Sequence, residues 1–391
     1  MSLTLGQFND SFPPIMDGVA NVVRNYAYWL EKKYGRCYVI TPYVPNYKDS
    51  EDFDVLRYAS LPVPGRYPYR AGIPYPSNEV KNKLINIPFD LVHAHSPFSA
   101  GQIALRVAKQ RKIPLIASFH TKFYDDFLVA VKSKTLAHAM TDYVVKFYQK
   151  ADIVWTLNQE TKNTLFSYGY KGLIDIVPPG IDFPANYNKN TKESVLKPLE
   201  KDGCYEFLFV GQQVWHKNLK LLIEALELLK EWGINFRMTM TGEGRDLIEI
   251  KELVHQLNLT EQFRFTGKIS DRDELQAVYS SAHLFLFPSV YDTFGLVVCE
   301  AASAGCPSLL IKNSSAAGII TEDYNGLLAE NDSRSYALAI RNAISNPENL
   351  MQIGNNAAKT LTRSWESAID EVALRYKEII DNNREHSAIA R

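Results

Sequence analysis

Short apolar runs alternate along the chain with segments of helical spacing. In the first half these runs lie at 3–8, 37–41, 89–95, 114–121, 151–157 and 174–177. Runs of this kind predict strands that are buried on both faces, as in a parallel sheet. The segment 19–33 has apolar residues at helical spacing, 123–150 predicts a further helical stretch, and 46–80 predicts an irregular connection. The alternation of strands and helices predicts an α/β fold.

The second half repeats this pattern. Its predicted strands and glycine turns lie at 205–211, 236–244, 264–268, 284–287 and 308–311, and its predicted helices at 219–229, 272–282, 294–304, 333–346, 350–360 and 365–382. Residues 383–391 are expected to form a frayed polar tail. Pro178, Pro179 and Gly180 form a stiff break between the halves. We therefore predict domains at 1–178 and 179–364, followed by a C-terminal helical segment at 365–391.

The segment 284–307 carries the strongest chemical signal. A buried strand stops at Pro288, Asp292 and Thr293 are placed to cap a helix, and the helix is expected to start at about Phe294. Glu300 is the single charged residue in the otherwise apolar stretch 294–302. A buried carboxylate is costly unless a partner pairs with it, so Glu300 is either a satisfied structural residue or part of a binding site.

The position of that helix favours the binding site. In an open α/β sheet, ligands bind where strands end and helices begin. The unpaired amides near Phe294, Gly295 and Leu296 would face any anionic or hydroxylated group in such a crevice. A sugar is a ligand of this kind.

Composition and charge narrow the classes of function. At 391 residues, with 46% hydrophobic and 22% charged residues, the chain is an ordinary globular protein with room for two domains. No apolar run is long enough to span a membrane and no signal-peptide pattern is present. Residues 1–180 hold 21 Lys and Arg against 15 Asp and Glu, and the remainder holds 22 against 29. The charges are dispersed, which argues against nucleic acid as a partner.

Metal and disulfide chemistry are not favoured. The four cysteines lie far apart or on apolar segments without a C-x-x-C pair, which is typical of a reduced cytoplasmic protein. His93 and His95 share one face of a predicted strand but have no third ligand close in sequence. Of the two Asp-x-Asp triplets, 52–54 lies in a polar loop and 271–273 looks like a helix cap. We expect no metal and no cofactor.

Residues 291–307, Tyr-Asp-Thr-Phe-Gly-Leu-Val-Val-Cys-Glu-Ala-Ala-Ser-Ala-Gly-Cys-Pro, resemble the signature of the retaining glycosyltransferases of family 4, a GT-B group. That signature has two acidic residues separated by seven, here Asp292 and Glu300. The first is usually Glu, so Asp292 is one methylene shorter. The resemblance covers most of the chain and implies two Rossmann-like domains facing across a cleft, with the C-terminal helix crossing back to the first domain.

The resemblance also implies roles for individual residues. Glu300 would hold the ribose of the donor, Asp292 and the amides of Phe294, Gly295 and Leu296 the sugar hydroxyls, and Lys217 the departing diphosphate. His120, in Ser-Phe-His-Thr, resembles the family's active-site histidine, although a structural histidine is the alternative. Gly18 and Gly211 stand at family glycines beside the ligands, although Asp17 replaces a second family glycine and a plain turn glycine is the alternative for Gly18. Gln212 replaces a family arginine, so Lys217 lacks its usual cationic neighbour, and an ordinary surface lysine is the alternative for Lys217.

The expected reaction is transfer of a hexose, with UDP-glucose as donor, to a hydroxyl acceptor. The segments 95–101 and 118–121 look most like members that glucosylate diacylglycerol. The basic, aromatic stretch 123–150 is consistent with contact with an anionic membrane surface, although solvated lysines over a packed core are the alternative. We expect a cytoplasmic protein, peripheral on the inner face of the membrane. The oligomeric state does not follow from the sequence.

Two rival functions stay open at this point. One is a GT-B enzyme of other chemistry, either a sugar-nucleotide epimerase, which would release nucleotide without an acceptor, or a phosphorylase-like enzyme. The other is a non-catalytic partner subunit in envelope assembly, since Asp292 and Gln212 depart from the family pattern. Hydrolysis of the donor without acceptor would argue for an active enzyme.

Overall fold

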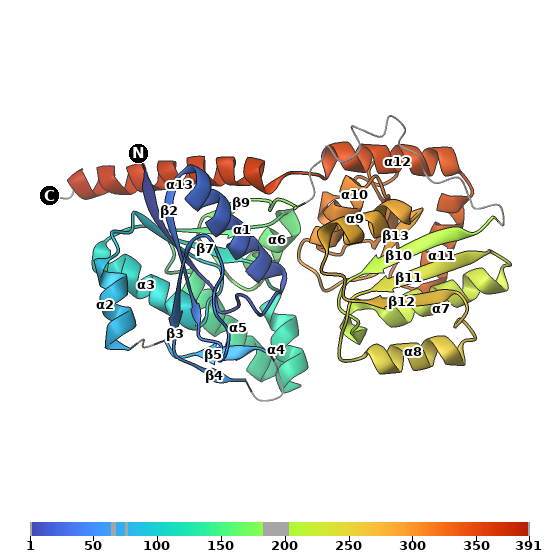
Figure 1. Cartoon of the computed structure of the whole chain (residues 1–391), viewed down its shortest axis with the longest axis horizontal. Coiled ribbons are helices and arrows are strands. Elements are labelled where there is room, and N and C mark those ends of the chain that lie inside the picture. Colours follow the sequence, from blue (N-terminus) through green and yellow to red (C-terminus); the bar gives the residue numbers. More distant parts are fainter. Residues whose placement is uncertain (1, 64–67, 75–76, 183–202, 390–391) are drawn as a thin grey trace. The chain divides into compact units, whose positions relative to one another are not determined.

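The computed structural model describes residues 2–63, 68–74, 77–182 and 203–389. It divides into two compact units, residues 1–180 with 365–391, and residues 181–364. The sequence-based boundary at 178/179 lies two residues before this division. Figure 1 shows an α/β arrangement in each unit, with helices on both faces of a twisted parallel sheet.

The first unit is built on a seven-stranded parallel sheet in the order β3-β2-β1-β6-β7-β8-β9. Its strands are β1 (Leu3–Phe8), β2 (Gly35–Pro42), β3 (Asp54–Tyr58), β6 (Leu91–Ala94), β7 (Leu115–Phe119), β8 (Ile153–Thr156) and β9 (Ile174–Ile176). Its helices are α1 (Gly18–Lys33), α2 (Asn78–Asn86), α3 (Ser99–Arg111), α4 (Phe123–Val131), α5 (Lys134–Tyr148), α6 (Gln159–Ser167) and α13 (Trp365–Ile389). A small antiparallel pair, β4 (Ser60–Pro62) and β5 (Arg70–Gly72), stands apart from the sheet.

Both faces of this sheet are covered, which explains why its strands are almost continuously apolar. In β7, Leu115, Ala117 and Phe119 join the core beneath α3 and α5, whereas Ile116 joins the core beneath α1 and α13. The C-terminal helix α13 belongs to the first unit, as the fold prediction required, and it shares a core with α1, which runs obliquely to it in Figure 1. Tyr376 of α13 is fully buried in that core.

The second unit has a six-stranded parallel sheet in the order β12-β11-β10-β13-β14-β15. Its strands are β10 (Tyr205–Val210), β11 (Phe236–Thr241), β12 (Phe263–Gly267), β13 (Leu284–Phe287), β14 (Ser308–Ile311) and β15 (Leu327–Ala329). Its helices are α7 (Leu219–Glu231), α8 (Leu247–Gln256), α9 (Arg272–Ser281), α10 (Leu296–Ser303), α11 (Ser333–Ile344) and α12 (Pro347–Thr360), with short 3-10 turns η2 (Trp215–Lys217) and η3 (Ala316–Ile319).

Three predicted segments differ in detail from the structure. Residues 46–80 contain strands β3, β4 and β5 and the start of α2. The stretch 123–150 is two helices, because Lys132 takes a left-handed conformation (φ 52°) and the side chain of Ser133 caps α5. Finally, α13 continues to Ile389, where a frayed tail was expected from 383.

Candidate active site

The candidate site lies at the ends of the two central strands of the second sheet. Strands β10 and β13 are neighbours, and the chain order runs outward from them in opposite directions. The loops that follow two such strands diverge and leave a crevice at the carboxyl edge of the sheet, where open α/β folds bind ligands. Gly211, Gln212 and Lys217 follow β10, and Asp292 and Gly295 follow β13. The sheet therefore brings both predicted loops to one edge.

A salt bridge joins these two loops. Lys217 Nζ lies 2.6 Å from Asp292 Oδ1, and both side chains are largely buried. Asn218, in a left-handed conformation (φ 61°), separates η2 from α7, and its Nδ2 donates to the carbonyl oxygen of Pro288 at 3.1 Å. Lys217 is thus held between the two loops by its ion pair with Asp292.

The second carboxylate oxygen of Asp292 has no such partner. Asp292 Oδ2 is shielded from solvent and makes no hydrogen bond within the described part of the chain. The prediction that Asp292 caps the following helix was wrong, because the cap residue of α10 is Gly295. Leaving a buried acceptor unsatisfied costs about 1–3 kcal/mol, so a hydrogen bond to this oxygen would be favourable.

The N-terminus of helix α10 has no capping side chain, so its first backbone amides are the groups found there. Gly295 is left-handed (φ 75°), and a Cβ there would approach Ala316 and Phe287 to 3.2 and 3.3 Å. Only glycine fits this turn without strain. The turn starts α10 at Leu296, two residues later than predicted, and no side chain makes a capping hydrogen bond. The amides of Phe294, Gly295 and Leu296 thus lie at the start of the helix, where carbonyl partners one turn back are lacking.

Glu300 is buried one turn into α10, with 7% of its surface exposed. Tyr279 donates its hydroxyl proton to Oε2 at 3.0 Å, and Arg272 Nη2 donates to Oε1 at 3.0 Å and to Asp182 at 2.8 Å. Burial raises the pKa of Glu300, while Arg272 and Tyr279 oppose that rise. The carboxylate is therefore paired, and each of its oxygens keeps a second lone pair that can accept a hydrogen bond.

The backbone of the glycine loop after β10 packs directly against the backbone of the loop after β11. A Cβ on Gly242 would collide with the carbonyl oxygen of Gly211, so the β10 and β11 loops can only meet this closely through glycine. Gln212 is exposed, whereas the next residue, Gln213, is buried and donates to the carbonyl oxygens of Gly211 and Thr241 at 3.4 Å. The loop therefore presents Gln212 outward.

The predicted site residues of the first unit lie at the equivalent sheet edge. Strand order reverses between β1 and β6, and His120 directly follows β7, the next strand along. Gly18 opens α1, and a Cβ there would meet no atom within 4 Å. His120 is buried, with its Nε2 3.1 Å from His95 Nδ1. Burial lowers the pKa of His120 to about 4 and the pKa values of His93 and His95 well below their usual range.

No group of three or more His, Cys, Asp or Glu residues in the described ranges is arranged to hold a metal ion. The nitrogens of His93 contact Tyr376 and Ser118 at 2.6 and 2.8 Å, so this side chain serves packing and hydrogen bonding. Asp271, from the second Asp-x-Asp triplet, caps α9 by accepting from the amide of Glu274, as predicted. All four cysteines are free and buried.

Comparison with known proteins decides the family. A family profile described as "Glycosyltransferase Family 4" matches residues 16–183, and one described as "Glycosyl transferases group 1" matches residues 190–360. The chain belongs to the family 4 glycosyltransferases. This glycosyltransferase is 25% identical to the alpha-monoglucosyldiacylglycerol synthase of Acholeplasma laidlawii over 97% of its own length and 98% of that protein. It is also 25% identical to the enzyme of that name from Streptococcus pneumoniae, over 83% of its length and 75% of that protein.

Solved structures confirm the GT-B fold. Sucrose-phosphate synthase from Thermosynechococcus elongatus matches with a TM-score of 0.76 and 18% identity, covering 97% of this glycosyltransferase and all of that chain. Anabaena HepE in complex with UDP and glucose matches with a TM-score of 0.72 and 16% identity, covering 96% and 99%. At this identity the likeness concerns the fold alone.

Several partners of the predicted residues were not foreseen. Arg272 and Tyr279, which hold Glu300, lie 28 and 21 residues before it in α9. The sequence indicated only that a buried Glu300 needs hydrogen-bond donors, because a buried carboxylate without them is costly. It did not show that the preceding helix, α9, supplies them. Nothing local indicated that Tyr376, 283 residues after His93, would bond to it.

The buried histidines predict acid sensitivity of the first unit. They are neutral when folded, whereas an unfolded histidine takes up a proton below a pH of about 6.5. Their lowered pKa values therefore stabilise the fold above that pH, and this stability is lost as the pH falls from about 6.5 toward 4. Each histidine contributes a slope of at most about 1.4 kcal/mol per pH unit. Hydrogen exchange of the β6 and β7 amides at pH 7.5 and 5.0 measures the loss. The free energy of unfolding should fall less steeply with decreasing pH in His93→Gln than in the parent protein. An equal pH dependence in the two proteins would contradict the assignment of His93 as a buried neutral histidine.

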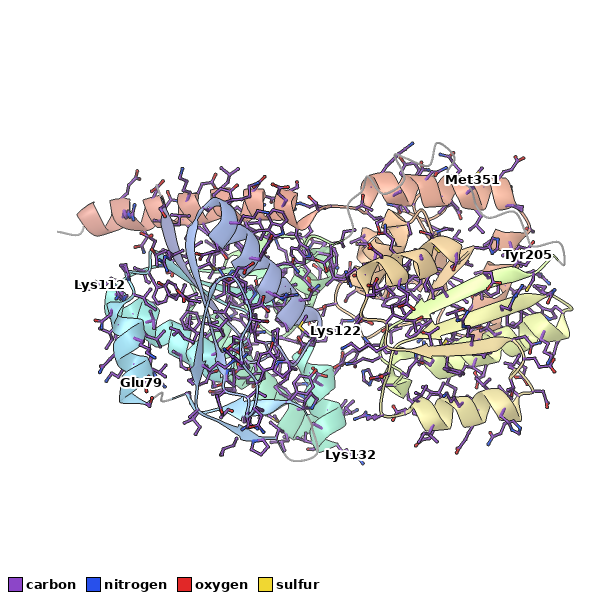
Figure 2. All side chains as sticks on the ribbon, viewed as in Figure 1. Glu79, Lys112, Lys122, Lys132, Tyr205 and Met351 are labelled. Carbon is purple, nitrogen blue, oxygen red and sulfur yellow. The ribbon has the colours of Figure 1, made fainter. Side chains whose placement is uncertain are left out.

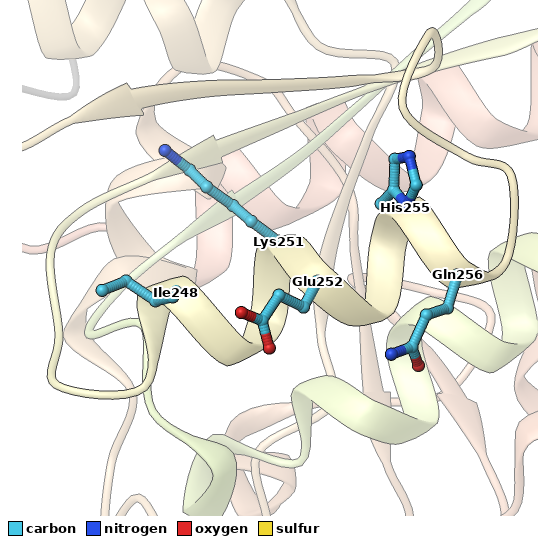
Figure 3. A pocket seen from close by; sticks show the side chains of 5 residues that line it. All are labelled: Ile248, Lys251, Glu252, His255 and Gln256. Atoms are coloured by element: carbon cyan, nitrogen blue, oxygen red, sulfur yellow. The ribbon is translucent and has the colours of Figure 1, made fainter.

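One surface hollow lies outside this site. It has a volume of about 360 Å³ and is lined by Ile248, Lys251, Glu252, His255 and Gln256. All five side chains come from α8, and Figure 3 shows them leaving that one helix in different directions. A hollow bounded by a single exposed helix has no opposing wall to enclose a ligand, so the sheet edge is the better candidate.

Proposed function

We propose that this glycosyltransferase transfers a hexose, with retention of α configuration, from a nucleotide diphosphate sugar to a lipid hydroxyl. UDP-glucose is the expected donor and diacylglycerol the expected acceptor. The observation that carries the proposal is the buried, unpartnered Oδ2 of Asp292, beside Lys217 and the open amides of α10. The glucosyldiacylglycerol synthases among its relatives support the acceptor, and the UDP and glucose bound by HepE support the donor.

Each group has a separate role in this proposal. Glu300 accepts hydrogen bonds from the ribose hydroxyls, while Asp292 Oδ2 and the α10 amides hold the sugar. Lys217 neutralises the diphosphate as the bond between the anomeric carbon and the phosphate oxygen breaks, an electrostatic contribution that usually dominates such catalysis. The acceptor oxygen bonds to the anomeric carbon from the same face, and its proton passes to the departing phosphate oxygen. No protein nucleophile and no metal enter this sequence.

A transfer assay tests the proposed function. The protein is incubated in EDTA with each common nucleotide sugar, first alone and then with vesicles that contain diacylglycerol. We expect an α-linked glucolipid from UDP-glucose in the presence of EDTA. Epimerised nucleotide sugar formed without acceptor would favour an epimerase. A strict need for Mn²⁺ would contradict the metal-free mechanism. If no donor were turned over, a non-catalytic subunit would be favoured.

Gln212→Arg is expected to tighten binding of the nucleoside diphosphate about 5- to 30-fold, because a hydrogen bond between charged groups contributes about 1–2 kcal/mol more than one from a neutral amide. Gln212 is exposed on the glycine loop, so the longer side chain has room. Isothermal titration with UDP measures the change, and Gln256→Arg at the C-terminal end of α8 is the control. Equal affinities for Gln212→Arg and the parent protein would show that the loop does not face the diphosphate.

A second part of the proposal is contact with an anionic membrane. No helix among residues 2–63, 68–74, 77–182 and 203–389 is long and apolar enough to cross a bilayer. Helices α4 and α5 expose Val129, Leu136 and Tyr143 to 58%, 49% and 56%. Basic side chains accompany them, including Lys122 and Lys132, which flank α4 (Figure 2). Exposed apolar side chains among lysines are the composition of an interfacial helix.

Vesicle flotation tests this surface. We expect binding to vesicles with anionic lipid, weaker binding to zwitterionic vesicles, and a loss of about tenfold or more in Val129→Asp with Leu136→Asp, since two apolar contacts are replaced by charges. Leu374→Asp is the matched control, because Leu374 is 64% exposed on α13 of the same unit. An equal effect of Leu374→Asp, or no effect of the α4–α5 pair, would contradict the proposed surface.

A further inference from the structure

One guanidinium group serves two carboxylates in the second unit. Arg272, at the start of α9, donates from the same nitrogen, Nη2, to Glu300 Oε1 at 3.0 Å and to Asp182 Oδ2 at 2.8 Å. The exposed fractions of these side chains are 10% for Glu300, 30% for Asp182 and 45% for Arg272. Glu300 has the least access to water of the three, so its charge depends most on the shared cation.

Asp182 is held beside Arg272 by the backbone that precedes it. The amide of Ile181 donates to the carbonyl oxygen of Arg363 at 2.8 Å, and Ile181 forms a parallel β-bridge with Ser364. Both contacts lie within the second unit. Glu300 therefore shares its cation with a second negative charge whose position is set by the fold of this unit.

The other surroundings of the Glu300 carboxylate are weakly polar. Titratable groups beside it, among the described residues, also include Tyr279, Cys299 and Asp182. Strands β13 and β14 and helix α12, which pack on α10 as well, bury apolar side chains, glycine and serine. Burial raises the pKa of Glu300, and the charge of Arg272 is the main influence that lowers it. The Tyr279 hydrogen bond also lowers this pKa, whereas the charge of Asp182 raises it.

The charge state of Glu300 decides which hydroxyl groups it can hold. An ionised carboxylate accepts hydrogen bonds on both oxygens, whereas a protonated carboxyl group uses one oxygen as a donor. Two ribose hydroxyls can therefore both donate only to the ionised form. A bond to a charged acceptor is also the stronger one. Ionised Glu300 thus favours a ribose over a deoxyribose more than protonated Glu300 does.

We propose that Arg272 is a positioning residue that keeps Glu300 ionised, and that it thereby sets the preference of the site for ribonucleotide over 2′-deoxyribonucleotide sugars. Asp182 weakens this effect, because it accepts from the same Nη2 group. The preference is lost as the pH falls and Glu300 takes up a proton, at a pH that Arg272 lowers and Asp182 raises. The ribose contact rests on the proposed function, whereas the control of the Glu300 charge does not.

Carbon NMR of protein carrying glutamate labelled with ¹³C at the carboxyl carbon measures the charge of Glu300, since that carbon shifts on protonation. The Glu300 signal is assigned by its loss in Glu300→Gln. We expect a carboxylate at pH 7 in the parent protein. The midpoint of its titration should move to higher pH in Arg272→Gln and to lower pH in Asp182→Asn. A protonated Glu300 at pH 7 in the parent protein, or an unchanged midpoint in Arg272→Gln, would overturn the proposal.

The affinities for two donors measure the consequence for binding. Isothermal titration between pH 6 and 8 gives the ratio of the dissociation constants of 2′-deoxy-UDP-glucose and UDP-glucose. Both donors carry the same diphosphate, so other effects of pH cancel in this ratio. In the parent protein we expect a ratio of about 10 or more at each pH, because one hydrogen bond to a charged acceptor is lost. In Arg272→Gln the ratio should fall about 3- to 10-fold from pH 8 to pH 6.

Arg237→Gln is the matched control for this change. Arg237 is also 45% exposed and pairs with Glu206 at 2.9 Å, near the start of β11. The variant removes the same charge from the same unit and should leave the ratio and its pH dependence unchanged. If Arg272→Gln does not fold, Asp182→Asn tests the proposal by itself, since it should extend the preference for UDP-glucose below pH 6. Loss of the preference at a higher pH in Asp182→Asn than in the parent protein would contradict the proposal.

Two results distinguish the failures. A parent protein that prefers UDP-glucose, with the same ratio at every pH in Arg272→Gln, would overturn the role of Arg272 and leave the proposed function intact. A parent protein in which Arg272 controls the charge of Glu300, but which binds both donors equally, would instead overturn the ribose contact of the proposed function.

Discussion

Replacing Glu300 by alanine is expected to weaken binding of the nucleotide sugar about 10²- to 10⁴-fold, because two hydrogen bonds to a charged carboxylate contribute about 1.5–3 kcal/mol each. Glu300 is 7% exposed and already held by Arg272 and Tyr279, so its position is fixed before a ligand arrives. The ribose hydroxyls then meet an acceptor that needs no reorganisation. Isothermal titration with UDP and UDP-glucose measures the loss, and turnover should fall in parallel.

Alanine at 300 also leaves the buried Tyr279 hydroxyl without its acceptor, which costs about 1–3 kcal/mol of folding stability. Glu300→Gln preserves the volume and one acceptor oxygen, so it separates affinity from stability. The control is Glu224→Ala on α7, where the carboxylate forms a long pair with Lys220 at 3.8 Å. Near-normal turnover of folded Glu300→Ala would refute the role of this residue.

Lys217→Ala is the second change with a large expected effect. We expect kcat to fall about 10²- to 10³-fold, since one preorganised donor at a developing negative charge contributes that much in other enzymes. The lysine is preorganised by its 2.6 Å salt bridge to Asp292, and Gln212 beside it carries no charge. The effect on kcat should exceed the effect on binding of UDP-glucose, because negative charge on the diphosphate grows as the sugar leaves.

Lys220→Ala is the matched control for this change. Lys220 is three residues further along the same loop and helix, 69% exposed, and paired only with Glu224 at 3.8 Å in the described part of the chain. It should leave kcat unchanged. If Lys217→Ala and Lys220→Ala lowered kcat equally, the effect would reflect the net charge of the unit rather than a contact with the leaving group.

The sequence predicted those parts of the site that depend on local pattern. The run 284–287 became β13, and Glu300 proved to be buried on the helix after it, because an apolar run stopped by proline and a lone carboxylate are both visible within one segment. Gly295 was expected inside that helix as its second residue, whereas it precedes α10 in a turn. Its left-handed conformation explains why glycine stands there.

The partners of these residues could not be predicted, because they come from distant segments. Asp292 was expected to cap its own helix, yet it pairs with Lys217, 75 residues earlier, once β10 and β13 become neighbours. Tyr376 reaches His93 because α13 packs on the first sheet. The break between α4 and α5 escaped detection because it contains neither glycine nor proline, only a left-handed Lys132 and the capping Ser133.

The most direct test of the nucleotide-sugar site is a crystal structure of the protein with bound UDP-glucose. It should show ribose hydroxyls donating to the Glu300 carboxylate, a diphosphate oxygen within hydrogen-bond distance of Lys217 Nζ, and a sugar hydroxyl on Asp292 Oδ2. A nucleotide bound elsewhere, with no contact to Glu300, would contradict the assignment.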